Sequence, residues 1–168
     1  MLFRSTTAAD SSGNGYNGTV TSPAWISGRV GSALNLNGTS SYVVTPPIPL
    51  TGPFSVSVWV NPAVTTQAVW GRILETQYDR GFYLGANSTG SKYKLIVNSA
   101  AGSTGNCGMP FGCTEGGTIT AGWHLLTATF DGSAAKLYVD GQTVGTDTLS
   151  PARSEEHTSE LQSRFGIS

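Results

Sequence analysis

Charge is scarce in this sequence. Lys, Arg, Asp and Glu together make up 11% of its 168 residues, against about 25% in typical soluble domains. The formal net charge is -1, so no basic field favours nucleic acid or an anionic membrane surface as a partner. No apolar run approaches the roughly 20 residues of a membrane-spanning helix, which excludes insertion by a helix.

Strong helix formers are also few. The sequence has 22 glycines and many Ser, Thr and Asn residues, which separate short runs rich in Val, Ile, Thr, Tyr, Phe and Trp. Such β-branched and aromatic runs, bounded by turn residues, are typical of strands. The length is sufficient for one domain with its own core. The composition therefore predicts an all-β fold with many turns.

The clearest predicted strand is residues 54–60. Apolar residues there alternate with Ser55, Ser57 and Trp59, which places the two sets on opposite faces. Further strands are predicted at residues 33–37, 41–45, 72–76, 81–85, 93–98, 123–130, 136–139 and 142–144. The first two of these are predicted to pair with each other across residues 38–40.

Two Asp-Gly turns divide residues 122–145 into three short strands. The second turn, Asp140-Gly141, is a strong hairpin signal, because a type I′ turn needs positive φ at both central residues. This block contains no plausible catalytic group. It is typical of a β-sandwich that binds or displays something.

Cys107 and Cys113 are the only cysteines. Their spacing, with Pro and Gly between them, favours a disulfide that closes one loop and contributes roughly 2 kcal/mol by the chain-entropy model. A zinc site is the alternative, but the domain offers one histidine and no further cysteine. A disulfide would indicate an oxidising compartment.

The composition changes abruptly after Pro151. Residues 153–163 carry four charged residues in eleven positions. One interpretation is a short polar helix capped by Ser154. The run also resembles, over all eleven residues, the in-frame translation of a common sequencing-library adapter. We therefore predict that residues 153–168 are a non-native tail without an evolved function.

Four segments, in this order and at suitable spacing, resemble the LamG-like jelly-roll domain of the concanavalin A-like lectin/glucanase superfamily: residues 6–19, 31–43, 54–62 and 123–141. The resemblance spans about residues 5–150. It implies a two-sheet antiparallel jelly-roll sandwich. Such domains are usually modules of secreted or surface proteins, beside enzymatic or adhesive domains.

Both ends depart from the family pattern. Members begin with an apolar strand, which residues 1–4 barely supply, and end with a strand that the adapter-like run replaces. We therefore expect residues 5–152 to be a LamG-like domain that is incomplete at both ends. The lack of a signal peptide is then uninformative. An unpaired sheet edge would make the isolated fragment poorly soluble or unstable.

A glycine-rich loop holds the candidate metal ligands Asp10, Asn14 and Asn17. Carboxylate and amide oxygens are the hard ligands that calcium prefers. Some members of the resembled family hold a structural calcium near this loop, which implies calcium as the cofactor. The alternative is that Asp10 caps a turn and the asparagines adopt left-handed backbone.

Aromatic side chains could stack on sugar rings. Trp70, Tyr78 and Tyr93 are the candidate ligand-binding residues, because their neighbours are polar and turn-forming. The other tryptophans are assigned to packing in the core or between the sheets: Trp25, Trp59 and Trp123.

Catalysis is not predicted. Related glucanases use a Glu-x-Asp-x-x-Glu strand, because retaining hydrolysis needs two carboxyl groups about 5.5 Å apart. Glu75 and Glu115 are the only glutamates before the tail, and the run from Glu75 to Asp79 has the wrong parity for that motif. His124 has no adjacent nucleophile pattern, so a structural role is predicted.

These observations predict a non-catalytic extracellular or cell-surface binding module from a larger protein. Its expected partner is a polysaccharide or a cell-surface or matrix glycoconjugate, beside the other domains of the parent protein. The alternative is a structural or adhesion spacer without a small ligand. A glycoside hydrolase fragment would require paired carboxylates that the sequence lacks. The binding module and the spacer differ in whether a sheet presents exposed aromatic residues.

Overall fold

The computed structural model describes residues 5–50, 52–67, 71–76, 81–98 and 112–148. These ranges contain thirteen strands and no helix, so the prediction of an all-β fold is confirmed. None of the described residues accordingly forms a helix that could cross a membrane. The strands divide between two compact units, residues 1–49 and residues 50–168. The predicted tail from residue 153 onward lies outside the described residues.

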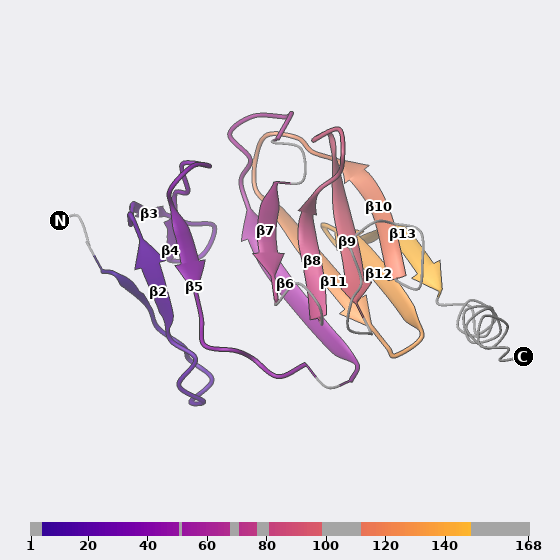
Figure 1. The fold of residues 1–168 in the computed structure, drawn as a ribbon. Coiled ribbons are helices and arrows are strands. Elements are labelled where there is room, and N and C mark those ends of the chain that lie inside the picture. The colour runs from indigo at the N-terminus through magenta and orange to yellow at the C-terminus, as the bar shows by residue number, and fades with distance from the viewer. Residues whose placement is uncertain (1–4, 51, 68–70, 77–80, 99–111, 149–168) are drawn as a thin grey trace, which may run out of the picture. The chain divides into compact units, whose positions relative to one another are not determined.

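The described part of the first unit contains five short strands: β1 (Thr7–Ala8), β2 (Gly18–Thr21), β3 (Trp25–Ser27), β4 (Ser32–Leu34) and β5 (Tyr42–Val44). Strands β1, β2 and β5 form one antiparallel sheet in that order, and Figure 1 labels β2 and β5. Strands β3 and β4 pair separately as a hairpin. Trp25 fastens this hairpin to the N-terminal segment, since its Nε1 donates a hydrogen bond to the Ser5 carbonyl at 2.8 Å.

The predicted pairing of residues 33–37 with residues 41–45 is wrong. Strand β4 pairs with β3, and β5 pairs with β2. The reason is the side chain of Asn37. Its Oδ1 accepts hydrogen bonds from the backbone N–H groups of the next turn, at 2.9 to 3.0 Å: Thr39, Ser40 and Ser41. The segment therefore closes on Asn37 instead of forming a ladder across residues 38–40.

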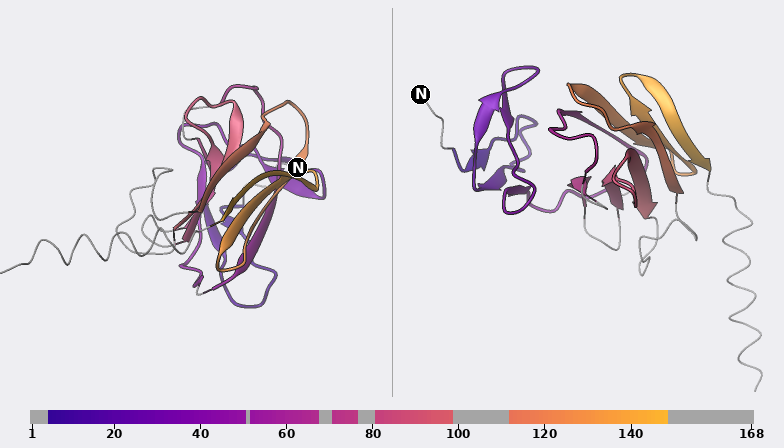
Figure 2. Two further views of the ribbon diagram at one scale, coloured as in Figure 1. Left: turned by 90° about the vertical axis from the view of Figure 1, so that its right-hand side faces the viewer. Right: turned by 90° about the horizontal axis from the view of Figure 1, so that it is seen from above.

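The second unit is built from two four-stranded antiparallel sheets, seen as two layers in Figure 2. The first sheet has the order β10 (Gly112–Thr118), β9 (Lys92–Asn98), β8 (Gly81–Ala86), β7 (Arg72–Glu75). The second has the order β13 (Gln142–Thr148), β12 (Ala134–Val139), β11 (His124–Phe130), β6 (Phe54–Val60). The strands predicted in this unit are confirmed, with ends that differ by a few residues.

Apolar side chains from both sheets form one core between the layers. Its buried members are Leu84, Ala86, Tyr93, Leu95, Val97, Ile119, Leu126, Ala128, Ala135 and Leu137. Each fully buried leucine contributes about 1.5–3 kcal/mol relative to an exposed one. The alternation of β6 is confirmed, because its apolar residues pack against this core. Trp59 points the other way and is 40% exposed, so its assignment to packing is wrong.

The Asp140-Gly141 hairpin is confirmed. The two residues have φ values of 50° and 80°, as a type I′ turn requires. They connect Val139 to Gln142, the closing pair of the β12–β13 ladder. The preceding Asp131-Gly132 turn is also present, and its Asp131 carboxylate accepts the N–H groups of Ser133 and Ala134.

Two glycines let the sheets approach closely where β10 runs beside β13. A Cβ on Gly116 would clash with the Val144 carbonyl, and a Cβ on Gly145 would clash with the Thr114 side chain. The Cys113 N–H donates to Asp147 Oδ2 at 2.7 Å in the same region. These contacts join the edge strands of the two sheets, and we call this region the β10–β13 seam.

Candidate functional site

The sandwich of the second unit has two outward sheet faces. The charged face is the outward side of the β7–β10 sheet, and its residues alternate with core residues: Arg72, Glu75, Tyr83, Gly85, Lys94, Ile96, Cys113 and Glu115. One row of opposed residues crosses all four strands, from Arg72 through Gly85 and Lys94 to Glu115. This row is the place where charges gather.

Arg72 and Glu75 form an ion pair within β7, with 2.7 Å between Nε and Oε2. They are three residues apart, yet both point outward, because a register shift interrupts the β7–β8 ladder between Arg72 and Leu74. Both side chains are well exposed. Such a pair contributes at most about 1 kcal/mol.

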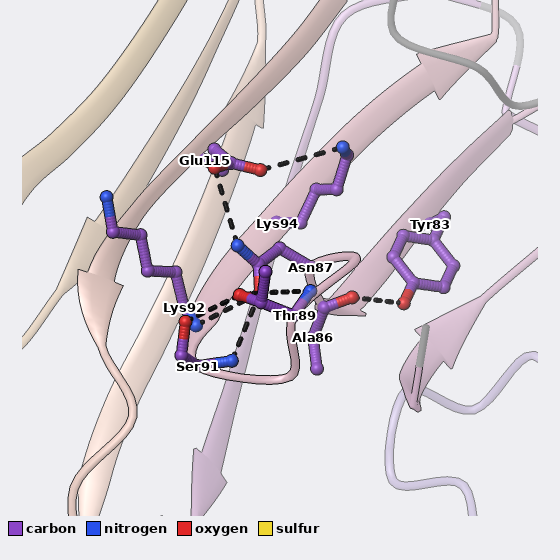
Figure 3. Close-up of polar contacts among 8 residues, drawn as sticks. All are labelled: Tyr83, Ala86, Asn87, Thr89, Ser91, Lys92, Lys94 and Glu115. Carbon is purple, nitrogen blue, oxygen red and sulfur yellow. Dashed lines mark hydrogen bonds and ion pairs between the residues drawn. The ribbon is translucent and has the colours of Figure 1, made fainter. Parts of the chain in front are cut away.

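Lys94 is different because its side chain is only 6% exposed. Its ammonium lies 3.7 Å from Glu115 Oε2, and Glu115 Oε1 accepts a hydrogen bond of 3.4 Å from Asn87 Nδ2 (Figure 3). A buried ammonium needs such compensation, since desolvation of an unpaired charge is costly. Asn87 therefore helps to position the Glu115 carboxylate for its ion pair with Lys94.

Asn87 also organises the turn between β8 and β9. Its Oδ1 accepts hydrogen bonds from the backbone N–H groups of Thr89, Ser91 and Lys92 (Figure 3). Asn87 is itself buried, so these bonds satisfy an oxygen that would otherwise lack a partner. One side chain thus joins the β8–β9 turn to the ion pair of the charged face.

Tyr83 lies across Gly85. A Cβ on Gly85 would stand 2.6 Å from Tyr83 Cζ, so only glycine leaves room for the ring. The phenol oxygen lies 2.8 Å from the Ala86 carbonyl (Figure 3). It also lies 3.2 Å from the Gly71 carbonyl. Burial raises the pKa of Tyr83 to about 12, with Arg72 opposing and Glu75 adding to the effect. The polar groups of the charged face are thus largely engaged with one another.

The hydroxyl face is the outward side of the other sheet, and most of its side chains carry hydroxyl groups: Ser55, Ser57, Trp59, Leu125, Thr127, Thr129, Lys136, Tyr138, Thr143 and Thr146. Ser57, Thr127, Tyr138 and Thr143 form one row across the four strands. Ser57 Oγ and Thr127 Oγ1 share a hydrogen bond of 2.9 Å. Of the described residues on this face, Lys136 alone carries a charge.

The two glutamates of the described region do not form a hydrolytic pair. Glu75 lies on β7 and Glu115 on β10, at opposite edges of one sheet. Three strand spacings across and two residues along the strand separate their backbones by roughly 16 Å. Glycosidases place their carboxyl groups about 5 to 9.5 Å apart. Each glutamate is also engaged with a neighbouring cation. The absence of enzymatic activity stays a prediction.

Comparison with known proteins identifies the family. A family model described as the concanavalin A-like lectin/glucanases superfamily matches residues 37–166. The chain belongs to this superfamily. The match includes part of the predicted tail. No curated protein matches this concanavalin A-like chain.

A crystal structure of an S-layer domain-containing protein from Clostridium thermocellum (its residues 221–444) has a similar fold. The TM-score is 0.53 and the sequence identity 23%, and the similarity covers 93% of this chain and 73% of that chain. The family match and the two packed sheets together confirm the predicted concanavalin A-like sandwich.

The predicted sugar-stacking residues of this concanavalin A-like chain have different outcomes. Tyr93 is 1% exposed and packs in the core, so its prediction as a stacking surface is wrong. Its polar neighbours in the sequence, Lys92 and Lys94, point away from it because residues alternate along β9. Trp70 and Tyr78 lie outside the described residues, so their role stays a prediction. Trp59 and Tyr42 are exposed aromatic residues that were not among the predicted ligand-binding residues.

The predicted disulfide also stays a prediction. Cys107 lies outside the described residues. Cys113 is on β10, beside the β10–β13 seam, and is only partly exposed.

The predicted calcium ligands of this concanavalin A-like chain lie together in one loop but are engaged with it. Asp10 accepts hydrogen bonds from the N–H groups of Ser12 and Tyr16 at 2.8 and 3.0 Å. Asn17 Oδ1 accepts the Asp10 N–H, and the Asn14 amide donates to the Ser12 hydroxyl. The Ser12 bonds, followed by the Tyr16 bond, lower the pKa of Asp10. The residues as arranged cap a turn, and calcium binding at this loop stays a prediction.

His124 has two hydrogen-bond partners that were not predicted. Its Nδ1 lies 2.7 Å from Asp140 Oδ2, and its Nε2 lies 2.9 Å from Thr120 Oγ1. Asp140 also accepts the N–H of Leu125 at 2.8 Å. The bond with His124, followed by that from Leu125, lowers the pKa of Asp140. Hairpin register could have revealed the contact, since pairing of Leu126 with Val139 brings Asp140 beside residues 124–125.

Proposed function

We propose that the chain is a non-catalytic carbohydrate-binding module of an extracellular or cell-surface protein. The observation that carries this proposal is the hydroxyl face. It presents Ser and Thr hydroxyls and the exposed Trp59 on one regular sheet. Hydroxyl groups can exchange hydrogen bonds with sugar hydroxyls, and an indole can pack on the apolar side of a pyranose ring.

Family membership supports a binding role, because the superfamily is named for lectins as well as glucanases. The similar crystal structure comes from an S-layer domain-containing protein, which favours a cell-surface setting. The partner would be a polysaccharide or a cell-surface or matrix glycoconjugate, and the parent protein would supply further domains. A Cys107–Cys113 disulfide and a structural calcium at the Asp10 loop are parts of the same proposal.

A second candidate is a structural or adhesion spacer without a small ligand. The charged face favours it, because its cations and carboxylates are paired with each other, in the Lys94–Glu115 and Arg72–Glu75 ion pairs. The two candidates differ in whether the isolated chain retains any glycan.

The test is binding of the full chain to a glycan array and to insoluble polysaccharides in a pull-down. The proposal predicts retention on at least one class of polysaccharide at micromolar protein. An array without hits at high protein density, together with an empty pull-down, would overturn it in favour of the spacer. A calcium titration on the same sample tests the metal, since a millimolar titration without heat would exclude a tight site.

A further inference from the structure

We infer that the hydroxyl face binds an extended acidic polysaccharide, with Trp59 and Tyr138 as its two ring-stacking positions and Lys136 as its charge contact. This inference rests on the proposed carbohydrate-binding function and assigns it a surface and a ligand class. The stacking positions differ from those that the sequence predicted.

The spacing of the two aromatic residues fits a chain molecule. Trp59 lies opposite Leu125, and Tyr138 lies opposite Thr127 on the other side of β11. Two strand spacings across and two residues along the strand separate their backbones by roughly 12 Å. A disaccharide unit has about this length. Rings on alternate sugars of one chain could therefore pack on Trp59 and Tyr138 together.

The part of the hydroxyl face between the two aromatic residues is rigid and polar. Thr127 lies between Ser57 and Tyr138 in the same row, and Thr129 lies between Ser55 and Lys136 in the next. Threonine has restricted χ1 freedom on a strand, so its hydroxyl loses little conformational entropy on binding. A regular sheet face of this kind suits an extended polymer better than a compact sugar.

Charge selects the class of polysaccharide. Lys136 is exposed and makes no ion pair with any described residue, and none of the described residues on this face is acidic. Asp131, in the turn before β12, is weakly coupled to Lys136: of the causes that shift the pKa of Asp131, the charge of Lys136 is the smallest, and it lowers that pKa. A carboxylate on the ligand would therefore meet an available ammonium, whereas a cationic polymer would be repelled.

The experiment is affinity electrophoresis of the full chain in native gels that contain carboxymethylcellulose or hydroxyethylcellulose, two soluble polymers with one backbone and different charge. We expect carboxymethylcellulose to retard the chain more strongly. Trp59→Ala should weaken that retardation about tenfold, which corresponds to roughly 1.4 kcal/mol. Lys136→Gln should weaken it two- to fivefold and remove most of its salt dependence.

Tyr42→Ala is the matched control, because Tyr42 is an exposed aromatic residue of β5 in the first unit and should leave retardation unchanged. Thermal melts check that each variant folds. If Trp59→Ala does not fold, the retardation of Lys136→Gln, a substitution at an exposed position, still tests the inference. Retardation of Trp59→Ala or Lys136→Gln equal to wild type, or stronger retardation by hydroxyethylcellulose, overturns the inference alone. A wild-type chain that no polysaccharide retains overturns the proposed function as well.

Discussion

The two outward faces of the sandwich use polar residues in opposite ways. On the charged face, Lys94 is buried against Glu115, Asn87 supports the pair, and the phenol of Tyr83 covers Gly85. On the hydroxyl face, Ser and Thr side chains and Trp59 face solvent. The first arrangement stabilises the unit, and the second presents hydroxyl groups and an indole ring at the surface. Substitutions should therefore separate the faces, since those on the charged face alter stability and those on the hydroxyl face alter binding.

The largest effect is expected at Gly85. In Gly85→Ala the new methyl group would meet the Tyr83 ring and the Gly71 carbonyl, and backbone cannot yield as a flexible side chain can. Overpacking of this kind costs about 2–3 kcal/mol, measured as the free energy of unfolding in urea. Gly52→Ala is the control, because nothing lies within 4 Å of that position. Equal stability of the two variants would contradict the packing of Tyr83 on Gly85.

Glu115→Gln should have the next largest effect. It leaves the buried ammonium of Lys94 without the Glu115 carboxylate, at a cost of about 1–2 kcal/mol in the free energy of unfolding. Glu75→Gln is the matched control, and its exposed pair with Arg72 should contribute less than 1 kcal/mol. A double variant, Lys94→Met with Glu115→Leu, should recover part of the loss. Similar costs for the two glutamine variants would show that burial of Lys94 adds nothing.

Tyr83→Phe should cost about 1 kcal/mol at neutral pH, through the lost phenol hydrogen bonds. A larger difference appears in alkali. Because the folded pKa of about 12 exceeds the ordinary value near 10, this tyrosine contributes stability below pH 10 that is lost as the pH rises towards 12. The wild type should therefore lose stability more steeply than Tyr83→Phe in that window. The measurement is a series of denaturant melts between pH 10 and pH 12, with tyrosinate absorbance as the readout. Equal slopes of unfolding free energy against pH for the wild type and Tyr83→Phe would contradict this prediction.

The smallest effect on stability is expected for Thr127→Ala on the hydroxyl face. It removes the hydrogen bond with Ser57 at the surface, and such changes stay within about 0.5 kcal/mol. The same variant should weaken polysaccharide retardation, because its hydroxyl lies between the two stacking residues. A loss of stability as large as that of Glu115→Gln would remove the contrast between the faces.

Local pattern predicted much of the second unit. Strict alternation located β6, and the positive φ required by a type I′ turn located Asp140-Gly141. Alternation along β6 also predicted the outward position of Trp59, because Trp59 lies on the same face of the strand as Ser55 and Ser57. Its assignment to packing relied on residue type and overlooked that alternation. Tyr93 was misplaced in the same way, since its polar sequence neighbours lie on the opposite face of the strand.

Strand partners and side-chain clusters were harder to predict. The pairing of β5 with β2 depends on contacts between residues distant in the sequence, and nothing local distinguishes it from a hairpin with residues 33–37. The Asn37 side chain decides that point by capping its own turn. The burial of Lys94 likewise depends on Glu115, which is distant in sequence and becomes its neighbour only through the β9–β10 register.

The β10–β13 seam determines how the second unit can come apart. Gly116 and Gly145 bring the edge strands of the two sheets into contact, and Asp147 accepts the Cys113 N–H across them, so separation of either strand also breaks these contacts. Strands β6 and β7 form the opposite edges. Local opening starts where contacts are fewest. We therefore expect the two sheets to separate first at the edges formed by β6 and β7 and last at the β10–β13 seam. In hydrogen exchange, the amides of β10 and β13 would be among the last to exchange.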